Sequence, residues 1–457
     1  MARRKIFLFS FYGVLGICLC SCDKLLDVGL PKNQLTTEDV FNDSTSIIAA
    51  TLNIYSLLER QHYAEFNRRL SNYTYETSSI SANEQGWNQS ALTADDSWIR
   101  TNWTYLYNAI YQCNALIEEL SRSEGITEDF RMGIIAEAMF LRAYCYFFLV
   151  NTFEHVPLIT GTDVNENRLK GQVESQVIYQ FIVSELNTVR NDMARFLPTE
   201  NTRANIHSVN ALLAKVYLFR SEWSLAEQLS TAVIEDGSFG TLESMGNVFT
   251  PASGETILQF ATQNGYLIES QTIVPSSAEV IPNYYFNTAF IESFELGDGR
   301  VREWMGSNTV MANGTVSRYV YPYKYKNRAA SNADPENVIV LRASELYLIR
   351  AEARANSGNL IGTPGAVSDV NLIRRRAGLP SIHPDTREGV LEAIYTERAH
   401  ELFFENGNLF MDLKRSGRLQ AVMSRAKATW RPYAALLPLP LHDILTNQNL
   451  IQNDGYN

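Results

Sequence analysis

The chain has 457 residues, of which 45% are hydrophobic and 19% are charged, as is usual for a globular protein with a large core. Its formal net charge is −11 at pH 7. This acidity argues against nucleic acid and anionic membrane surfaces as partners, because like charges repel.

The start of the chain has the pattern of a secretory signal peptide. Three basic residues, Arg3, Arg4 and Lys5, precede an almost entirely apolar run at residues 6–19. A membrane-spanning helix needs about 20 apolar residues, so this run is short for a permanent anchor.

Three cysteines crowd the end of the apolar run, which closes with Leu19-Cys20-Ser21-Cys22. This stretch resembles the lipobox of bacterial lipoproteins, in which the last cysteine becomes the acylated N-terminus. We therefore expect residues 1–21 to be removed, Cys22 to be lipidated and residues 22–40 to form a tether. Several acyl chains on one cysteine would hold the protein on a membrane. The alternative is an uncleaved anchor with incidental cysteines.

Beyond the tether, apolar residues recur at helical spacing through most of the chain. Single helices are predicted at residues 43–59, 103–120, 130–153 and 177–196. Helix pairs with short turns are predicted at 211–219 with 223–233, at 344–356 with 365–377, and at 392–404 with 408–422. Small residues such as Ala214 and Ala226 let paired helices approach closely, as in tetratricopeptide repeats. The irregular spacing of the pairs argues against a regular solenoid.

Residues 237–335 differ from the helical parts on either side, at 41–236 and 336–457. They are rich in glycine, proline, asparagine, serine and aromatic residues, and include strand-like runs such as 256–260. The aromatic content argues against disorder, and long loops in compact proteins are commonly functional. The predicted fold is mainly α: an irregular, tetratricopeptide-like scaffold of helical pairs, with a long loop-rich insertion that contains short strands.

A series of motifs runs along nearly the whole mature chain. It begins with the lipobox and residues 23–27. The others are the 103–114 helix, 142–150 with 156–158, 211–217, 341–353 (LRASELYLIRAEA), 371–380, 397–407 (ERAHELFFENG) with 410–414, 437–440 and 452–456 (QNDGY). Together and in this order, these motifs resemble those of the SusD/RagB family of outer-membrane nutrient-binding lipoproteins and are specific to it.

The resemblance implies a lipid-anchored protein on the outer face of the outer membrane. Such proteins cover a SusC-type TonB-dependent transporter, capture oligosaccharides or in some members peptides, and pass them to the transporter. They are not enzymes, so the resemblance implies neither catalytic residues nor a cofactor, and no metal site is expected.

No catalytic motif in the sequence competes with this interpretation. The six histidines form no His-Glu-x-x-His pattern, and no Gly-x-Ser-x-Gly or Cys-x-x-Cys motif occurs. Asp95 and Asp96 form an acidic doublet near Trp98, but a glycosidase needs two carboxylates about 5–9.5 Å apart across the scissile bond. We expect this doublet to be solvated or to cap a helix. A helical glycoside hydrolase and a tetratricopeptide scaffold that binds a protein segment remain the alternatives.

Charged and thiol groups on the apolar helices are expected to be structural. A buried charge needs a partner, so interhelical ion pairs are predicted for Arg142, Glu352, Arg374, Arg376, Arg398 and Glu405. Cys113 and Cys145 could form a disulfide in an oxidising compartment or remain buried free thiols. The sequence leaves both states open.

A sugar presents C–H faces and hydroxyl groups, so its site needs flat aromatic surface and a few polar side chains. Two predicted loop regions offer both, at 83–98 and within the insertion. The candidate ligand-binding residues are Trp87, Asn88, Trp98, Tyr285, Trp304 and Tyr321. In an alternative interpretation, Trp98 begins the 103–120 helix and packs inward. Trp103 and Tyr325 are expected to lie in the core.

Overall fold

The structure, a computed structural model, describes residues 41–456 except 264, 266, 313 and 330–334. The predicted signal peptide and tether, with Cys22, therefore lie outside the described residues. The described chain is mainly helical, and its strands form two-stranded pairs. The predicted mainly α fold is confirmed.

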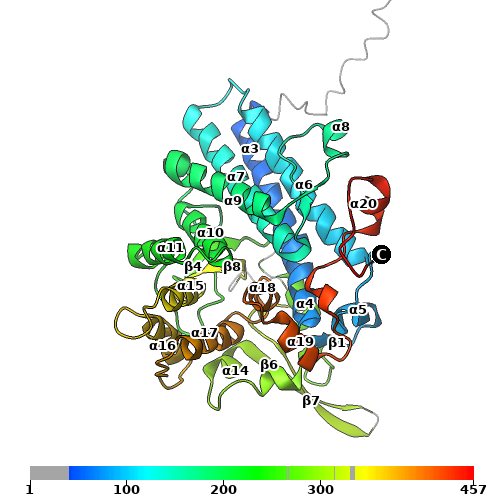
Figure 1. Ribbon diagram of the computed structural model, residues 1–457, viewed down its shortest axis with the longest axis vertical. Coiled ribbons are helices and arrows are strands. Elements are labelled where there is room, and N and C mark those ends of the chain that lie inside the picture. The colour runs from blue at the N-terminus through cyan, green and yellow to red at the C-terminus, as the bar shows by residue number, and fades with distance from the viewer. Residues whose placement is uncertain (1–40, 264, 266, 313, 330–334, 457) are drawn as a thin grey trace, which may run out of the picture.

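Long helices form the N-terminal half (Figure 1). They are α3 (Ser44–Leu57), α4 (Ala64–Tyr73), α6 (Ser97–Leu120), α7 (Glu128–Phe153) and α9 (Ser175–Thr188), with a π-helical turn at Leu58–Tyr63. Helix α7 packs between α6 and α9. It is long and apolar enough to cross a bilayer, but 89% of its apolar window is buried within the protein. Its apolar surface is therefore that of a core helix.

Helix α6 begins at Ser97, earlier than predicted, because Asp96 caps it. The Oδ1 atom of Asp96 accepts the backbone N–H groups of Trp98 at 2.9 Å and Ile99 at 3.0 Å. Side-chain acceptors at this position satisfy N–H groups that lack a partner within the helix. The capping role expected for the acidic doublet is thus confirmed for Asp96, and Trp98 lies in the first helical turn.

Packed helix pairs dominate the second half of the chain. The helices are α10 (Ile206–Phe219), α11 (Trp223–Asp236), α15 (Ala343–Asn356), α16 (Ala366–Arg376), α17 (Arg387–Glu401), α18 (Asn408–Arg415), α19 (Leu419–Ala426) and α20 (Leu441–Thr446). Helix α10 packs on α11, α11 on α15, and α15 on α16 and α17. The predicted helix at 408–422 is wrong, because Gly417 takes a left-handed conformation (φ 70°) between α18 and α19.

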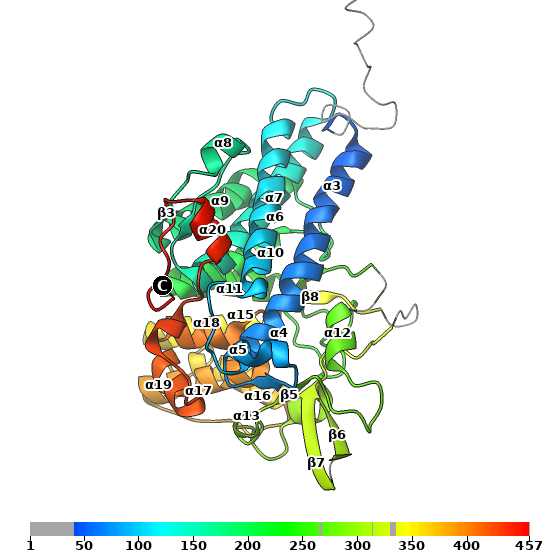
Figure 2. The ribbon, with the colours of Figure 1, turned by 90° about the vertical axis from the view of Figure 1, so that its right-hand side faces the viewer.

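The insertion between α11 and α15 contains the predicted short strands. Strand β4 (Thr256–Phe260) pairs with β8 (Val338–Arg342), and β5 (Tyr284–Phe286) pairs with β1 (Thr77–Ser79), all antiparallel. Strands β6 (Met305–Ala312) and β7 (Thr315–Pro322) form a hairpin that projects from the end opposite the start of α3 (Figure 1, Figure 2). The β1–β5 pair joins the insertion to the N-terminal half.

All six charged residues that were predicted to form ion pairs do so. The pairs include Arg142–Glu185, Glu352–Arg415, Arg374–Glu295, Arg376–Glu255, Arg398–Asp412 and Glu405–Arg342. Their partners come from other helices or from the insertion. These side chains therefore connect the scaffold and are not available to a ligand.

The two cysteines of the described chain are buried free thiols on neighbouring helices, α6 and α7. Burial raises the pKa of the Cys113 thiol to about 12, and it raises the pKa of Cys145 well above the usual range. The thiolate is the reactive form, so these cysteines are inert core residues.

A connected group of buried charges centres on Arg342 at the end of β8. Its Nη1 atom lies 2.8 Å from Glu255 Oε1 and 2.6 Å from Glu401 Oε1. Its Nε atom donates to Glu405 Oε2 at 2.9 Å. One guanidinium thus joins the residue before β4, the end of α17 and the turn that follows α17.

Three more cations complete this central ion cluster. Arg376 of α16 and Arg300 of the insertion contact Glu401, while Lys324 Nζ lies 2.5 Å from Glu405 Oε1. Burial alone would raise the pKa of Glu401, but Arg376, Arg342 and Arg300 hold it well below its usual range. We define the central ion cluster as Glu255, Arg300, Lys324, Arg342, Arg376, Glu401 and Glu405.

Removing one carboxylate from this cluster should strongly destabilise the protein. Glu401→Gln keeps the side-chain shape but leaves three guanidiniums without their shared anion. Such a loss costs about 3–5 kcal/mol of unfolding free energy, measurable by urea denaturation. Glu392→Gln is the control, because Glu392 and Arg418 form an exposed pair worth about 0–1 kcal/mol. Equal stabilities for the two variants would contradict a structural role for the cluster.

Candidate functional site

The half-buried ring of Trp98 lies against a guanidinium. The Cζ atom of Arg69, on α4, is 3.7 Å from the centroid of the indole ring. Arg69 is itself held by Glu84 at 2.9 Å and by Glu65 at 2.5 Å. A cation over an aromatic face is attracted by the ring quadrupole. Arg69 therefore fixes the orientation of the indole and covers part of one face.

The alternative placement of Trp98 is partly confirmed. The residue does lie at the start of α6, and it packs against the edge of the main core. It nevertheless keeps part of its surface in solvent, and the segment that precedes it carries the exposed polar residues Asn83, Gln85 and Asp95. Ligand contact by Trp98 stays a prediction.

A second aromatic surface lies on the insertion. The rings of Tyr285 on β5 and Tyr319 on β7 meet edge to face, with centroids 5.4 Å apart, and both are half-buried. Strand alternation turns the neighbouring Tyr284 inward, where its hydroxyl accepts the Nε–H of Arg68 at 3.1 Å. Two adjacent arginines of α4 thus contact the two aromatic surfaces: Arg69 contacts Trp98, and Arg68 contacts Tyr284 beside Tyr285.

Trp87 was predicted to face solvent, and this prediction is wrong. It lies in the short helix α5 (Gln85–Asn88) with only 1% of its surface exposed. Its ring packs edge-on against Tyr73, with centroids 5.8 Å apart. The polar residues around it line the outside of the short helix, so the indole is a core side chain that cannot stack on a ligand.

The side chain of Asn88 is also used structurally. Its Oδ1 atom accepts the backbone N–H of Ser79 at 2.9 Å, and its Nδ2 atom donates to the Ser79 carbonyl at 2.7 Å. The amide therefore replaces a strand partner at the end of β1. The prediction that it is presented to a ligand is not supported by this geometry.

Trp304 and Tyr321 are buried, contrary to the prediction that they belong to a ligand surface. The indole N–H of Trp304 donates to the Met245 carbonyl at 2.9 Å, and Lys324 lies 4.8 Å from its ring centroid. The ring of Tyr321 covers Gly306 on the partner strand, where a Cβ atom would lie 2.4 Å from it. Both aromatic residues shield the backbone or the central ion cluster from water.

The expected core position of Trp103 is confirmed, and Tyr325 is half-buried and packs against the core. Trp103 is buried and meets Phe153 edge to face at 5.0 Å between centroids. The Tyr325 hydroxyl accepts the backbone N–H of Ile339 at 2.8 Å. The sequence analysis placed Tyr319 in the candidate region of the insertion without singling it out, although alternation along β7 puts it on the same face as Tyr321. It missed Arg69, whose distant contact with Trp98 leaves no local pattern.

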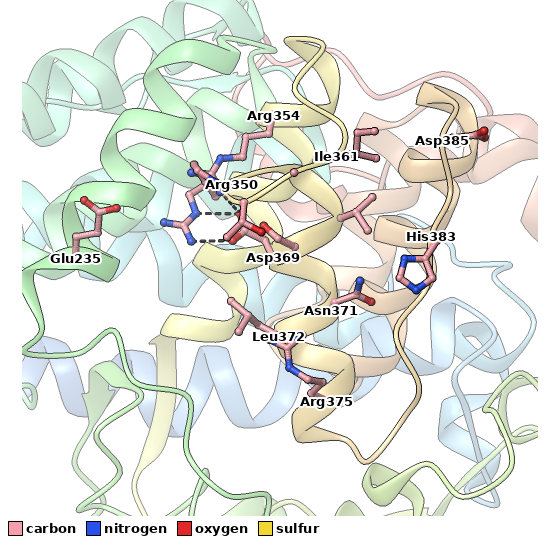
Figure 3. A pocket seen from close by; sticks show the side chains of 15 residues that line it. Glu235, Arg350, Arg354, Ile361, Asp369, Asn371, Leu372, Arg375, His383 and Asp385 are labelled. Carbon is pink, nitrogen blue, oxygen red and sulfur yellow. Dashed lines mark hydrogen bonds and ion pairs between the residues drawn. The ribbon is translucent and has the colours of Figure 1, made fainter.

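A cavity of about 690 Å³ opens between α11, α15 and α16 (Figure 3). Its floor is an ion-paired group in which Asp369 accepts from Arg350 at 2.7 Å and from Arg354 at 2.8 Å. No tyrosine, tryptophan or phenylalanine is among the fifteen described residues that line it. Without aromatic surface, and with Arg350 and Arg354 already paired with Asp369, this cavity does not suit a sugar ring.

Within the described part of the chain, no three histidine, cysteine, aspartate or glutamate side chains are grouped as metal ligands. The two carboxylates that hold Arg69, Glu65 and Glu84, are ion-paired: burial opposes ionisation of Glu65, but Arg68 and Arg69 still lower its pKa. A general acid needs the opposite shift. This arrangement is suited to holding an aromatic ring in place.

Two family models match the chain. One, described as SusD family, covers residues 293–456, and the other, described as starch-binding associating with outer membrane, covers residues 24–218. Among curated relatives, SusD-like protein P25 of Formosa agariphila is 24% identical over 96% of both chains. Starch-binding protein SusD of Bacteroides thetaiotaomicron is 23% identical over 78% of this chain and 79% of its own.

Solved structures share the fold. A SusD superfamily protein from Parabacteroides distasonis superposes with a TM-score of 0.77 at 22% identity, covering 90% of this chain and 99% of its own. A laminarin-binding SusD-like protein superposes with a TM-score of 0.73 at 22% identity, with the same coverage. The mainly helical architecture is therefore that of the SusD superfamily.

If Arg69 orients Trp98, removing its charge should loosen the indole. Arg69→Met retains the aliphatic stem but loses a cation–π contact worth about 0.5–2 kcal/mol. We expect stronger acrylamide quenching of Trp98 fluorescence, isolated as the difference between this variant with and without Trp98→Phe. Arg68→Met is the matched control, since Arg68 contacts Tyr284 instead. Equal quenching in the two variants would contradict the assignment.

Proposed function

Because this chain belongs to the SusD family, we propose that it binds oligosaccharide nutrients at the surface of the outer membrane and delivers them to a SusC-type TonB-dependent transporter. The description of the N-terminal family model, starch-binding associating with outer membrane, supports this proposal. So do the names of two similar proteins, one starch-binding and the other laminarin-binding.

Trp98 is the observation that carries the binding part of the proposal. Its indole is partly exposed and held by Arg69, and the preceding segment of the chain carries exposed polar residues. A sugar ring can stack its C–H face on such a surface while amides pair with its hydroxyls. Because the ring is already oriented, little conformational entropy is lost when a ligand binds. The Tyr285–Tyr319 pair offers a second surface of the same kind.

The same geometry favours binding over hydrolysis. Asp96 is occupied in capping α6, and Glu65 and Glu84 are tied to Arg69. None of these three is free to donate a proton to a glycosidic oxygen, as a glycosidase acid must. We therefore propose a binding protein without enzymatic activity. A peptide ligand and a scaffold for a protein segment are the alternatives that the experiments below separate.

The proposed anchor rests on the sequence, because Cys22 precedes the described residues. Acyl chains on Cys22 would place the helical body beside the membrane, with residues 22–40 as the tether. Each buried CH₂ contributes about 0.8 kcal/mol, so two or more chains give lasting attachment. A protein tethered in this way stays close to a transporter in the same membrane.

Ligand binding should depend on the exposed rings and not on the buried ones. Calorimetry with starch, laminarin and their oligosaccharides, beside a peptide mixture, should give a dissociation constant of about 1 μM to 1 mM. Trp98→Ala should weaken binding about tenfold or more, and Tyr285→Ala should also weaken it, with little change in melting temperature.

Trp87→Phe is the control for these substitutions. It should lower the melting temperature and leave the affinity unchanged, because Trp87 is a core side chain. Unchanged affinity in both surface variants would remove these two rings from the site. Binding of peptides and of no glycan would favour the peptide alternative.

The anchor and the partner can be tested on protein from its native membrane. Mass spectrometry should find an acylated N-terminal peptide that begins at Cys22. Extraction in a mild detergent should recover a large TonB-dependent transporter with the protein. Retention of Met1 or an unmodified Cys22 would contradict lipidation, and recovery of soluble proteins only would favour the scaffold alternative.

A further inference from the structure

Tyr111 is the most exposed aromatic side chain among the described residues. It has 46% of its surface exposed, followed by Tyr433 with 38%. Burial of an aromatic side chain is favourable, so exposure on this scale has a cost unless a ligand or partner covers the ring. Tyr111 is on α6 but belongs to neither of the aromatic surfaces described above.

Tyr111 forms one wall of a cavity of about 590 Å³. Trp103, Tyr107 and Tyr111 recur every fourth residue and so lie along one side of α6. The opposite walls come from α8 (Val164–Asn167) and α20, which flank α6 in both views (Figure 1, Figure 2). This volume is within the range of about 300–1,000 Å³ that is usual for ligand pockets.

Hydrogen bonds tie the walls of this pocket together. The Tyr107 hydroxyl donates to the Pro157 carbonyl at 2.8 Å, and Asn447 Nδ2, just after α20, donates to the Lys170 carbonyl at 2.8 Å. Within the 157–170 segment, Asn167 Nδ2 donates to the Gly161 carbonyl, also at 2.8 Å. Two segments that are distant in the sequence are thus joined to α6 and to each other, so a ligand would not have to order them.

Polar groups line the pocket beside the rings. Asp443 on α20 is half-buried, while Thr104, Thr446 and Arg168 are exposed. A carboxylate accepts hydroxyl donors, and guanidinium and threonine groups bond to hydroxyl or ring oxygens. The pocket therefore combines aromatic faces with neutral hydroxyl groups, one carboxylate and one guanidinium. This combination suits a ligand with many hydroxyl groups, such as a sugar. The Asp443 carboxylate bonds to the Trp103 side chain, and its remaining lone pairs can accept sugar hydroxyls.

We propose that this pocket, lined by Tyr107, Tyr111 and Asp443, is a second sugar-binding site that takes part of the same polysaccharide as the Trp98 surface. The inference rests on the proposed function. Tyr111 lies about 20 Å from Trp98 along α6, at a rise of about 1.5 Å per residue, and on a different side of the helix. Two separated sites on one rigid helix would retain a long chain better than a short one, by raising its effective concentration at the second site.

The test compares short and long ligands on the full-length protein. Calorimetry with laminarin and amylopectin, and with their short oligosaccharides, is run on wild type, Tyr111→Ala, Asp443→Asn and Trp98→Ala. Tyr111→Ala and Asp443→Asn should each weaken polysaccharide binding about tenfold and change short-ligand binding at Trp98 less than about twofold. Tyr433→Ala is the matched control, because Tyr433 is similarly exposed elsewhere, and it should change neither.

Fluorine NMR of 3-fluorotyrosine-labelled protein gives a direct readout of the pocket. The Tyr111 signal, assigned by its loss in Tyr111→Ala, should shift on adding sugar, and it should still shift in Trp98→Ala. A shift that disappears in Trp98→Ala is a transmitted effect and overturns the proposal. No Tyr111 shift while glycan binds through Trp98 overturns only the second site, whereas no glycan binding at all overturns the proposed function as well. A shift caused only by peptides also overturns the sugar assignment.

Discussion

The shared carboxylate of Glu401 is the constraint on which most of this structure depends. It is buried at the end of α17 and meets cations from α16, from β8 and from the insertion. A buried carboxylate with so many partners tolerates only one arrangement of the elements that carry them, because separating any one of them leaves a charge without solvent or partner. The central ion cluster therefore sets the position of the insertion on the helical scaffold.

The packing around the central ion cluster extends to the aromatic surfaces that are suited to ligands. Trp304 and Phe403 lie against the ammonium group of Lys324, at 4.8 Å and 3.9 Å from their ring centroids, and cover the cluster on the insertion side. Strand β5 continues this packing to β1 and brings Tyr285 beside Tyr319. On α4, Arg69 holds Trp98 in the same manner, with a charge below the ring. The partly exposed ring of Trp98 is thus fixed by a cation that is itself ion-paired.

Hydrophobic periodicity was sufficient to predict most of the long helices and their pairing, because it depends on neighbours three or four residues apart. Charges on these apolar helices predicted that ion pairs would form, but not which residues would be the partners. Periodicity failed at Trp87, since a helix as short as α5 gives no periodic signal and its polar residues, Asn88 among them, imitate a loop. It also failed at Trp304 and Tyr321, whose burial depends on partners far along the chain. The orientation of Trp98 depends on Arg69 in a helix that the sequence analysis did not predict. Exposure of an aromatic residue is therefore a property of tertiary packing that composition alone does not reveal.

Helices α11 and α15 pack directly against each other although the whole insertion separates them in the sequence. The two ends of the insertion therefore join the scaffold at neighbouring points, so the segment between them can be replaced as a unit. Related proteins could diversify this segment, and engineers could graft it, without redesigning the helices. One condition limits such exchange: Glu255, Arg300, Lys324 and Arg342 of the central ion cluster all lie between α11 and α15. A replacement segment would have to supply one anion and three cations at the same places, or else bring an apolar substitute for the whole cluster.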